Sequence, residues 1–107
     1  MKELEVIAKA MLEKKAQNVC SLDLTTLGTA ITDHFVICNA DSSAQVNAIA
    51  DNVEEMMLAE CKTKVLRTQG KENGLWVILD YGFIVVHIFT TEYRAFYHLE
   101  DLWADAK

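Results

Sequence analysis

Proline is absent from the sequence, and so are low-complexity segments, internal repeats and long runs of like charge. Nothing therefore marks a linker or a domain boundary, and we expect residues 1–107 to form one domain. No apolar run approaches the roughly 20 residues that a membrane-spanning helix needs. The N-terminus alternates charged and apolar residues, whereas a signal peptide contains an uninterrupted apolar stretch. These absences predict a cytoplasmic protein that has no membrane partner.

Cysteine and basic residues are also scarce. The three cysteines are an odd number and form no CxxC pair, so we expect free thiols in a reducing compartment and no disulfide framework. The 10 basic side chains are outnumbered by 16 acidic ones, which gives a net charge of −6. Because such a chain repels phosphate backbones and has no basic patch, direct sequence-specific binding of nucleic acid is not expected. An acidic surface would favour a basic protein partner.

Hydrophobic periodicity predicts two amphipathic helices and a shorter third one. The first should cover residues 3–15 with an inner stripe of Leu4, Ile7, Ala8, Met11 and Leu12. The second should begin at Ser42 or Ser43 and end near Cys61, with Gln45 completing a capping box from Ser42. Its inner stripe should be Val46, Ile49, Ala50, Val53 and Met57. Thr90 or Thr91 should cap the last helix, which is expected to end near Tyr97.

Five segments are predicted to be β-strands: 19–24, 35–38, 63–68, 75–80 and 83–89. The order αββαβββα predicts an α/β (α+β) fold in which helices flank a mixed sheet of about five strands. The strand at 63–68 follows the strand at 35–38 through a helix. A right-handed crossover between parallel neighbours is therefore expected at this point.

The last two strands form a predicted hairpin with a two-residue loop, Tyr81 and Gly82. That loop would give the pairs Asp80 with Phe83, Ile78 with Val85, and Trp76 with His87. One face is then aliphatic and should lie under helices: Leu75, Val77, Leu79, Ile84, Val86 and Ile88. The other face combines aromatic rings with a carboxylate and an imidazole: Trp76, Ile78, Asp80, Phe83, Val85, His87 and Phe89. Such a mixture is typical of a protein interface, and a covering helix would explain it equally well.

Patterns that would indicate catalysis or metal binding are weak. The three histidines, His34, His87 and His98, share no ligand spacing with one another or with another metal ligand. The glycines match neither a phosphate-binding loop nor a dinucleotide fingerprint, so they are expected in turns. Cys20 and Cys38 are expected to be small core residues, with Cys61 more exposed. We therefore expect no catalytic residue, no metal and no cofactor.

Motifs along most of the chain resemble the ribosomal silencing factor family, also called the Iojap-related family. The resemblance rests on residues 74–82 (GLWVILDYG) and 85–89 (VVHIF), and on Arg94, Phe96, Tyr97, Leu99, Glu100, Leu102 and Trp103. Asp33 and residues 35–37 are similar to the family's first core strand, and residues 42–53 to its capped second helix. The resemblance implies a mixed sheet with flanking helices, related to nucleotidyltransferases but without their catalytic motif.

The resemblance also implies a function and a site. Such proteins bind ribosomal protein uL14 on the large subunit, block joining of the small subunit, and so repress translation under nutrient limitation or in stationary phase. They also form homodimers when free. The implied docking residues are Trp76, Asp80, Tyr81, His87, Phe89, Arg94 and Tyr97. Phe83 departs from the family, which usually has aspartate or another polar residue after the glycine. Trp103 is expected to anchor the C-terminal segment.

Two other functions are compatible with the sequence. One is a nucleotidyltransferase-like enzyme in which Asp33 or Asp80 would hold Mg²⁺ against a nucleotide, although the Gly-Ser entry motif and paired strand aspartates are missing. A thermal shift with Mg²⁺ and nucleoside triphosphates would reveal such binding. The other is a homodimeric module whose mixed face pairs with itself.

Overall fold

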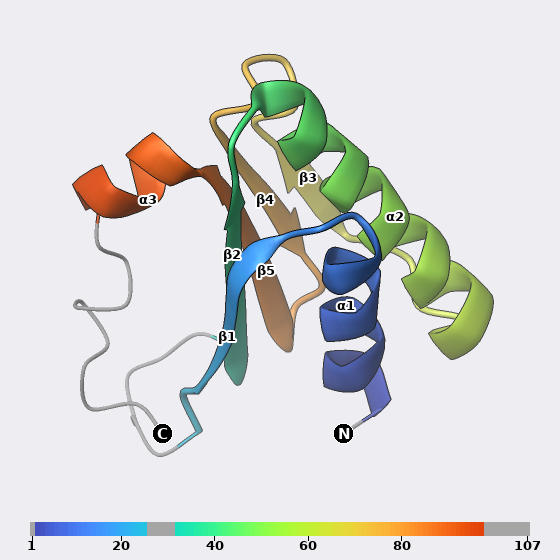
Figure 1. The fold of residues 1–107 in the computed structure, drawn as a ribbon. Helices are drawn as coiled ribbons and strands as arrows, with labels where there is room; N and C mark the ends of the chain where they lie inside the picture. The colour runs from blue at the N-terminus through green and yellow to red at the C-terminus, as the bar shows by residue number, and fades with distance from the viewer. Residues whose placement is uncertain (1, 26–31, 98–107) are drawn as a thin grey trace.

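The computed structural model describes residues 2–25 and 32–97, with the side chains of 96 and 97 left out. Its elements are α1 (Lys2–Glu13), β1 (Gln17–Asp23), β2 (His34–Ala40), α2 (Ser43–Cys61), β3 (Arg67–Gln69), β4 (Trp76–Asp80), β5 (Ile84–Thr90) and α3 (Thr91–Tyr97). This order confirms the predicted αββαβββα arrangement (Figure 1). Among the described residues, no helix is long and apolar enough to span a membrane. The predicted packing of Leu99, Leu102 and Trp103 lies outside the described residues.

The strands form one mixed sheet in the order β1-β2-β5-β4-β3. β2 and β5 are parallel at its centre, and the remaining neighbours are antiparallel. The mixed sheet was predicted, but the crossover between adjacent strands was wrong, because β5 and β4 lie between β2 and β3. β3 is only three residues long and polar, which suits a sheet edge, whereas β5 is almost wholly buried and suits the centre.

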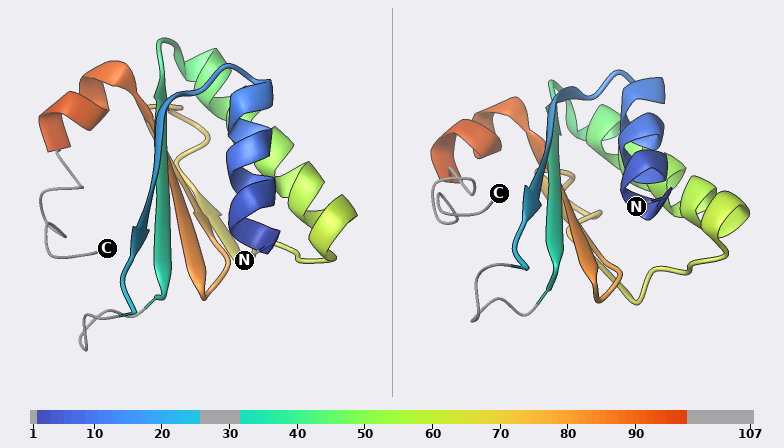
Figure 2. Two further views of the ribbon diagram at one scale, coloured as in Figure 1. Left: turned by 60° about the horizontal axis from the view of Figure 1, so that its bottom comes forward. Right: turned by 90° about the horizontal axis from the view of Figure 1, so that it is seen from below.

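The sheet has two differently covered faces. α1 and α2 cover one face, and α3 lies on the other (Figure 1, Figure 2); we call these the α1/α2 face and the α3 face. The core beneath α1 and α2 is largely aliphatic and takes Val36, Cys38, Val77, Leu79, Ile84, Val86 and Ile88 from the sheet. The predicted aliphatic face of the hairpin is therefore confirmed, apart from Leu75, which precedes β4 and is half-buried. Burial raises the pKa of the Cys38 thiol to about 12.

The inner stripe of α2 agrees with the prediction in full: Val46, Ile49, Ala50, Val53 and Met57 are buried. The stripe of α1 is rotated from the predicted one and consists of Val6, Ile7, Ala10 and Met11, while Leu12 is 61% exposed. Apolar residues occupy both possible stripes, so periodicity alone does not show which stripe is buried. The buried stripe is the one that faces α2 and the sheet, against which α1 packs.

Two polar side chains of α2 join it to the end of α1. Ser42 caps α2 by accepting the Gln45 amide at 3.1 Å, but the Gln45 side chain does not return to Ser42 as a capping box requires. It donates to the carbonyls of Lys14 and Lys15 at 3.1 and 3.2 Å. Asn52 donates to the Ala10 carbonyl at 2.9 Å. The predicted Ser42 cap is thus confirmed, whereas the return bond of the capping box is wrong. The Gln45 side chain instead donates to carbonyls that the end of α1 leaves without a partner in the helix.

The β4–β5 hairpin turns one residue later than predicted. The register pairs Trp76 with Phe89, Ile78 with His87 and Asp80 with Val85. The predicted pairs were wrong by two residues because Tyr81 belongs to the ladder, its amide donating to the Ile84 carbonyl at 2.9 Å. Gly82, with a φ of 88°, and Phe83 make the turn. A shift of two keeps strand residues on their predicted faces, but Phe83 leaves the mixed face and packs against the α1/α2 core.

A polar network attaches α3 to the sheet. Asn39, which is buried in β2, donates to the Thr91 hydroxyl at 3.0 Å and accepts from the Arg94 guanidinium at 3.0 Å. Arg94 also donates to the Asn18 carbonyl of β1. The first turn of α3 is therefore held at the carboxyl end of β2, and Tyr93 packs against the α3 face.

Candidate functional site

The α3 face carries the aromatic part of the molecule. Side chains from four neighbouring strands share it: Leu22, Phe35, Ile37, Val85, His87, Phe89, Trp76, Ile78 and Asp80. Ile37 and Phe89 are buried at its centre, and Leu22, Phe35, Trp76 and Tyr93 pack around them while partly exposed. A surface of half-exposed aromatic and aliphatic groups around a small buried core is typical of a protein interface.

Trp76 is placed by two neighbours on β5. Its ring stacks on Phe89, with centroids 4.8 Å apart and planes 28° apart. Its indole Nε1 donates to Nδ1 of His87 at 3.1 Å. Phe35 of β2 contacts His87 as well, and the two rings meet edge to face with centroids 4.7 Å apart. Trp76 is half-buried, whereas His87 and Phe89 are only 5% and 0% exposed.

His87 is neutral at physiological pH. Burial lowers the pKa of its imidazole to about 4. Because indole N–H is a donor only, Nδ1 must be the accepting nitrogen and the proton of neutral His87 is assigned to Nε2. That Nε2 is buried and has no hydrogen-bond partner among the described residues. A buried N–H without a partner is costly, so the ring's contacts with Trp76, Phe35 and Phe89 must outweigh that cost.

Asp80 and Tyr81 are neighbours in sequence but lie on opposite faces. Asp80, on the α3 face, is half-buried and accepts the Gly82 amide at 2.8 Å, which stabilises the hairpin turn. Tyr81 lies in the α1/α2 core and is 4% exposed. Burial raises the pKa of the Tyr81 phenol well above its usual value. The structure therefore does not bring Tyr81 together with the rest of the predicted docking residues.

Arg94 and Tyr97 belong to α3. The Arg94 guanidinium donates to the Asn39 side chain and to the Asn18 carbonyl, and these two hydrogen bonds fix α3 to the sheet. Tyr97 ends the helix, and its side chain lies outside the described residues. Of the seven predicted docking residues, Trp76, Asp80, His87 and Phe89 share one face, and Arg94 holds the helix beside that face.

The sequence-based docking set omitted the contribution of β1 and β2. Leu22, Phe35 and Ile37 complete the α3 face next to β5. The continuous apolar run at 35–38 did indicate a strand buried on both faces. It did not indicate that β2 pairs with β5 in parallel, because parallel register leaves no local signal in the sequence.

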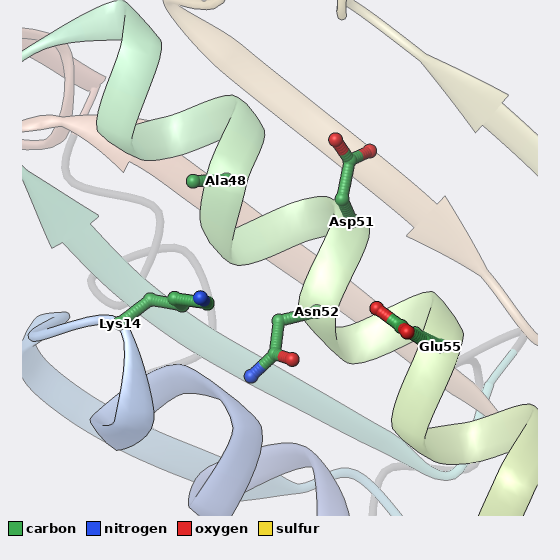
Figure 3. A pocket seen from close by; sticks show the side chains of 5 residues that line it. All are labelled: Lys14, Ala48, Asp51, Asn52 and Glu55. Carbon is green, nitrogen blue, oxygen red and sulfur yellow. The ribbon is translucent and has the colours of Figure 1, made fainter.

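Other candidate sites are poorer. A groove of about 250 Å³ lies between the end of α1 and α2, lined by Lys14, Ala48, Asp51, Asn52 and Glu55 (Figure 3). Two of its polar side chains already serve the fold: Asn52 binds α1, and Asp51 forms an ion pair with Lys71 at 2.6 Å. Within residues 2–25 and 32–97, no three histidine, cysteine or acidic side chains are grouped to hold a metal ion. The α3 face is thus the best candidate site.

Known proteins resemble the chain over nearly all its length. A family described as "Ribosomal silencing factor during starvation" matches residues 1–107. "Ribosomal silencing factor RsfS" of Halalkalibacterium halodurans is 38% identical over 103 residues, which are 96% of this chain and 86% of that protein. "Protein Iojap, chloroplastic" of Zea mays is 37% identical over 100 residues, covering 94% of this chain and 42% of the maize protein.

The fold is shared as well. A crystal structure of a protein from Chromobacterium violaceum has a TM-score of 0.90 at 29% identity, and the match covers 96% of this chain and 84% of that one. Sequence and fold thus agree over almost the whole chain, including the strands that form the α3 face. The chain belongs to the ribosomal silencing factor family.

Proposed function

We propose that this chain is a non-enzymatic translation repressor that docks on ribosomal protein uL14 of the large subunit through the α3 face and blocks joining of the small subunit. The observation that carries the proposal is the half-exposed Trp76, stacked on Phe89 at the centre of an apolar face. Membership of a family named for ribosome silencing supports the choice of partner.

The mechanism needs no bond to be made or broken. Large aromatic groups in well-packed surroundings carry much of the energy of protein interfaces, and Trp76 is such a group. Ile78, Val85 and Phe35 are half-buried on the same face and would lose further apolar area on docking. Asp80, at the hairpin end of the face, supplies a carboxylate for a basic side chain of the ribosomal protein. A protein seated on the intersubunit surface then excludes the small subunit by its volume.

The proposal is tested by sedimentation. The purified chain is mixed with separated ribosomal subunits, and sucrose gradients show where it migrates and whether joined ribosomes form. Comigration with the large subunit together with loss of joined ribosomes is expected. If the protein stays at the top of the gradient and joining is unaffected, the proposal is wrong.

A single substitution tests the face itself. Trp76→Ala is expected to weaken docking by about 2 kcal/mol or more, as truncation of an interface hot spot does. Leu58→Ala is the matched control, because Leu58 is an exposed apolar residue of α2, on the other side of the sheet. Trp76→Ala should also bind isolated uL14 more weakly than Leu58→Ala does. A folded Trp76→Ala that docks as well as the parent chain would remove Trp76 from the site.

A further inference from the structure

His87 and Phe89 belong to the predicted docking set, yet neither offers a surface to a partner. Both are almost completely buried, and His87 Nε2 has less than 1 Å² of accessible area. Trp76, in contrast, contacts both of them and is partly exposed. Any effect of His87 on docking therefore has to pass through a more exposed neighbour.

The contacts of Trp76 define its orientation in two ways. Stacking on Phe89 sets the plane of the indole, but a stacked ring can still slide or flip over while keeping its apolar contact. The hydrogen bond from indole Nε1 to His87 Nδ1, at 3.1 Å, removes that freedom because it requires the N–H edge to point toward β5. An ordered aromatic side chain loses less entropy on binding than a mobile one.

We infer that His87 is a positioning residue, which holds the Trp76 indole in its docking orientation by accepting the Nε1–H bond and does not itself contact the partner. The docking part of this inference rests on the function proposed above, whereas the effect of His87 on Trp76 is a property of the free protein. The two parts are therefore measured separately.

The chain offers a matched pair of substitutions. His87→Asn places an amide oxygen two bonds from Cβ, as Nδ1 is, so it keeps an acceptor for the indole. His87→Leu has nearly the same shape as His87→Asn and accepts no hydrogen bond. Thermal unfolding confirms that each variant is folded before it is compared.

The first measurement is the indole N–H signal in ¹H–¹⁵N NMR spectra of the free protein. The chain has two tryptophans, and Trp103→Phe identifies the signal of Trp76. His87→Leu should move this signal toward that of a free indole and speed its exchange with water, and His87→Asn should reverse most of the change. An unchanged signal in His87→Leu would show that His87 does not hold Trp76.

The second measurement is affinity for the large subunit in a double-mutant cycle. His87→Leu should weaken docking by about three- to tenfold, the effect of one net hydrogen bond, and His87→Asn should restore most of it. In the Trp76→Ala background, His87→Leu should cause no further loss. An equal loss in both backgrounds would mean that His87 contacts the partner directly, which overturns the inference.

The two measurements also separate the inference from the proposed function. If the parent chain does not bind the large subunit at all, the proposed function fails, and the NMR result still decides whether His87 positions Trp76. If the parent chain binds and Trp76→Ala weakens docking while His87→Leu does not, the function stands and the positioning role is wrong.

Discussion

The two faces of β5 differ although they alternate along the same seven residues. Ile84, Val86 and Ile88 point to the α1/α2 face and are completely buried. Val85, His87 and Phe89 point to the α3 face, where the imidazole of His87 and the ring of Phe89 contact the half-exposed Trp76. The first set fills a space between a sheet and two helices. In the second set, His87 and Phe89 support one aromatic side chain at the surface, so the same strand fills the core on one side and forms part of the proposed docking surface on the other.

The largest expected effect is on the free energy of unfolding, and it distinguishes the two faces of β5. Ile88→Ala removes a fully buried side chain from the α1/α2 core and should lower the free energy of unfolding by about 3 to 4 kcal/mol. Val85→Ala, three residues earlier on the α3 face, should cost less than about 1 kcal/mol because Val85 is already half-exposed. Urea unfolding of both variants measures the difference. Equal losses would mean that the two faces are not distinct.

The α3 face should also make stability depend on pH. The folded-state pKa of His87 is about 4, below the ordinary 6.5, so the unfolded chain takes up this proton first as the pH falls. Stability is therefore complete above pH 6.5 and declines as the pH drops through the window from 6.5 to 4, by about 3 kcal/mol in total. His87→Leu should flatten the profile in this window. A parent chain equally stable at pH 6.5 and pH 4.5 would contradict a neutral, buried His87.

Tyr81 allows a test on the α1/α2 face. Its hydroxyl is buried without a partner among the described residues, so Tyr81→Phe should raise the free energy of unfolding by about 1 kcal/mol. Because Tyr81 lies away from the α3 face, docking on the large subunit should be unchanged. Weaker docking of a stable Tyr81→Phe would return Tyr81 to the binding site.

The smallest effect concerns the end of α2. Lys62 ends the helix in the left-handed region with a φ of 55°, a conformation that costs less for glycine. Lys62→Gly should therefore stabilise the protein by about 0.5 to 1 kcal/mol and leave docking unaffected. Thermal unfolding measures the gain. A loss of stability would indicate that the Lys62 side chain contributes contacts of its own.

Prediction from the sequence succeeded where the signal was local. The stripe of α2, the Ser42 cap and the division of the hairpin into two faces all depend on residues a few positions apart. Apart from Phe83, the face assignment survived the wrong turn, because a two-residue shift preserves the alternation of side chains.

Prediction from the sequence failed for features that depend on contacts between segments far apart in the chain. The neighbours of β3, the parallel pairing of β2 with β5, and the contribution of Phe35 to the α3 face depend on strands far apart in sequence. The resemblance to a family identified Tyr81 as a docking residue, but a family motif does not distinguish an interface residue from a core residue next to it. The structure shows that Asp80 and Tyr81 lie on opposite faces, with Tyr81 in the α1/α2 core.

The position of β5 has a consequence for how the chain folds. Of the strands within residues 2–25 and 32–97, β5 is the last to be synthesised, yet it is the one that joins β2 to β4. Until residues 84–90 have left the ribosome, the β1–β2 pair and the β3–β4 pair have no strand between them, and the apolar side of α2 has no complete sheet to cover. Folding must then wait for contacts between distant segments, which are slow to form. A nascent chain that ends before β5 should therefore remain open to proteases and chaperones, and emergence of residues 84–90 should trigger folding of the whole sheet at once.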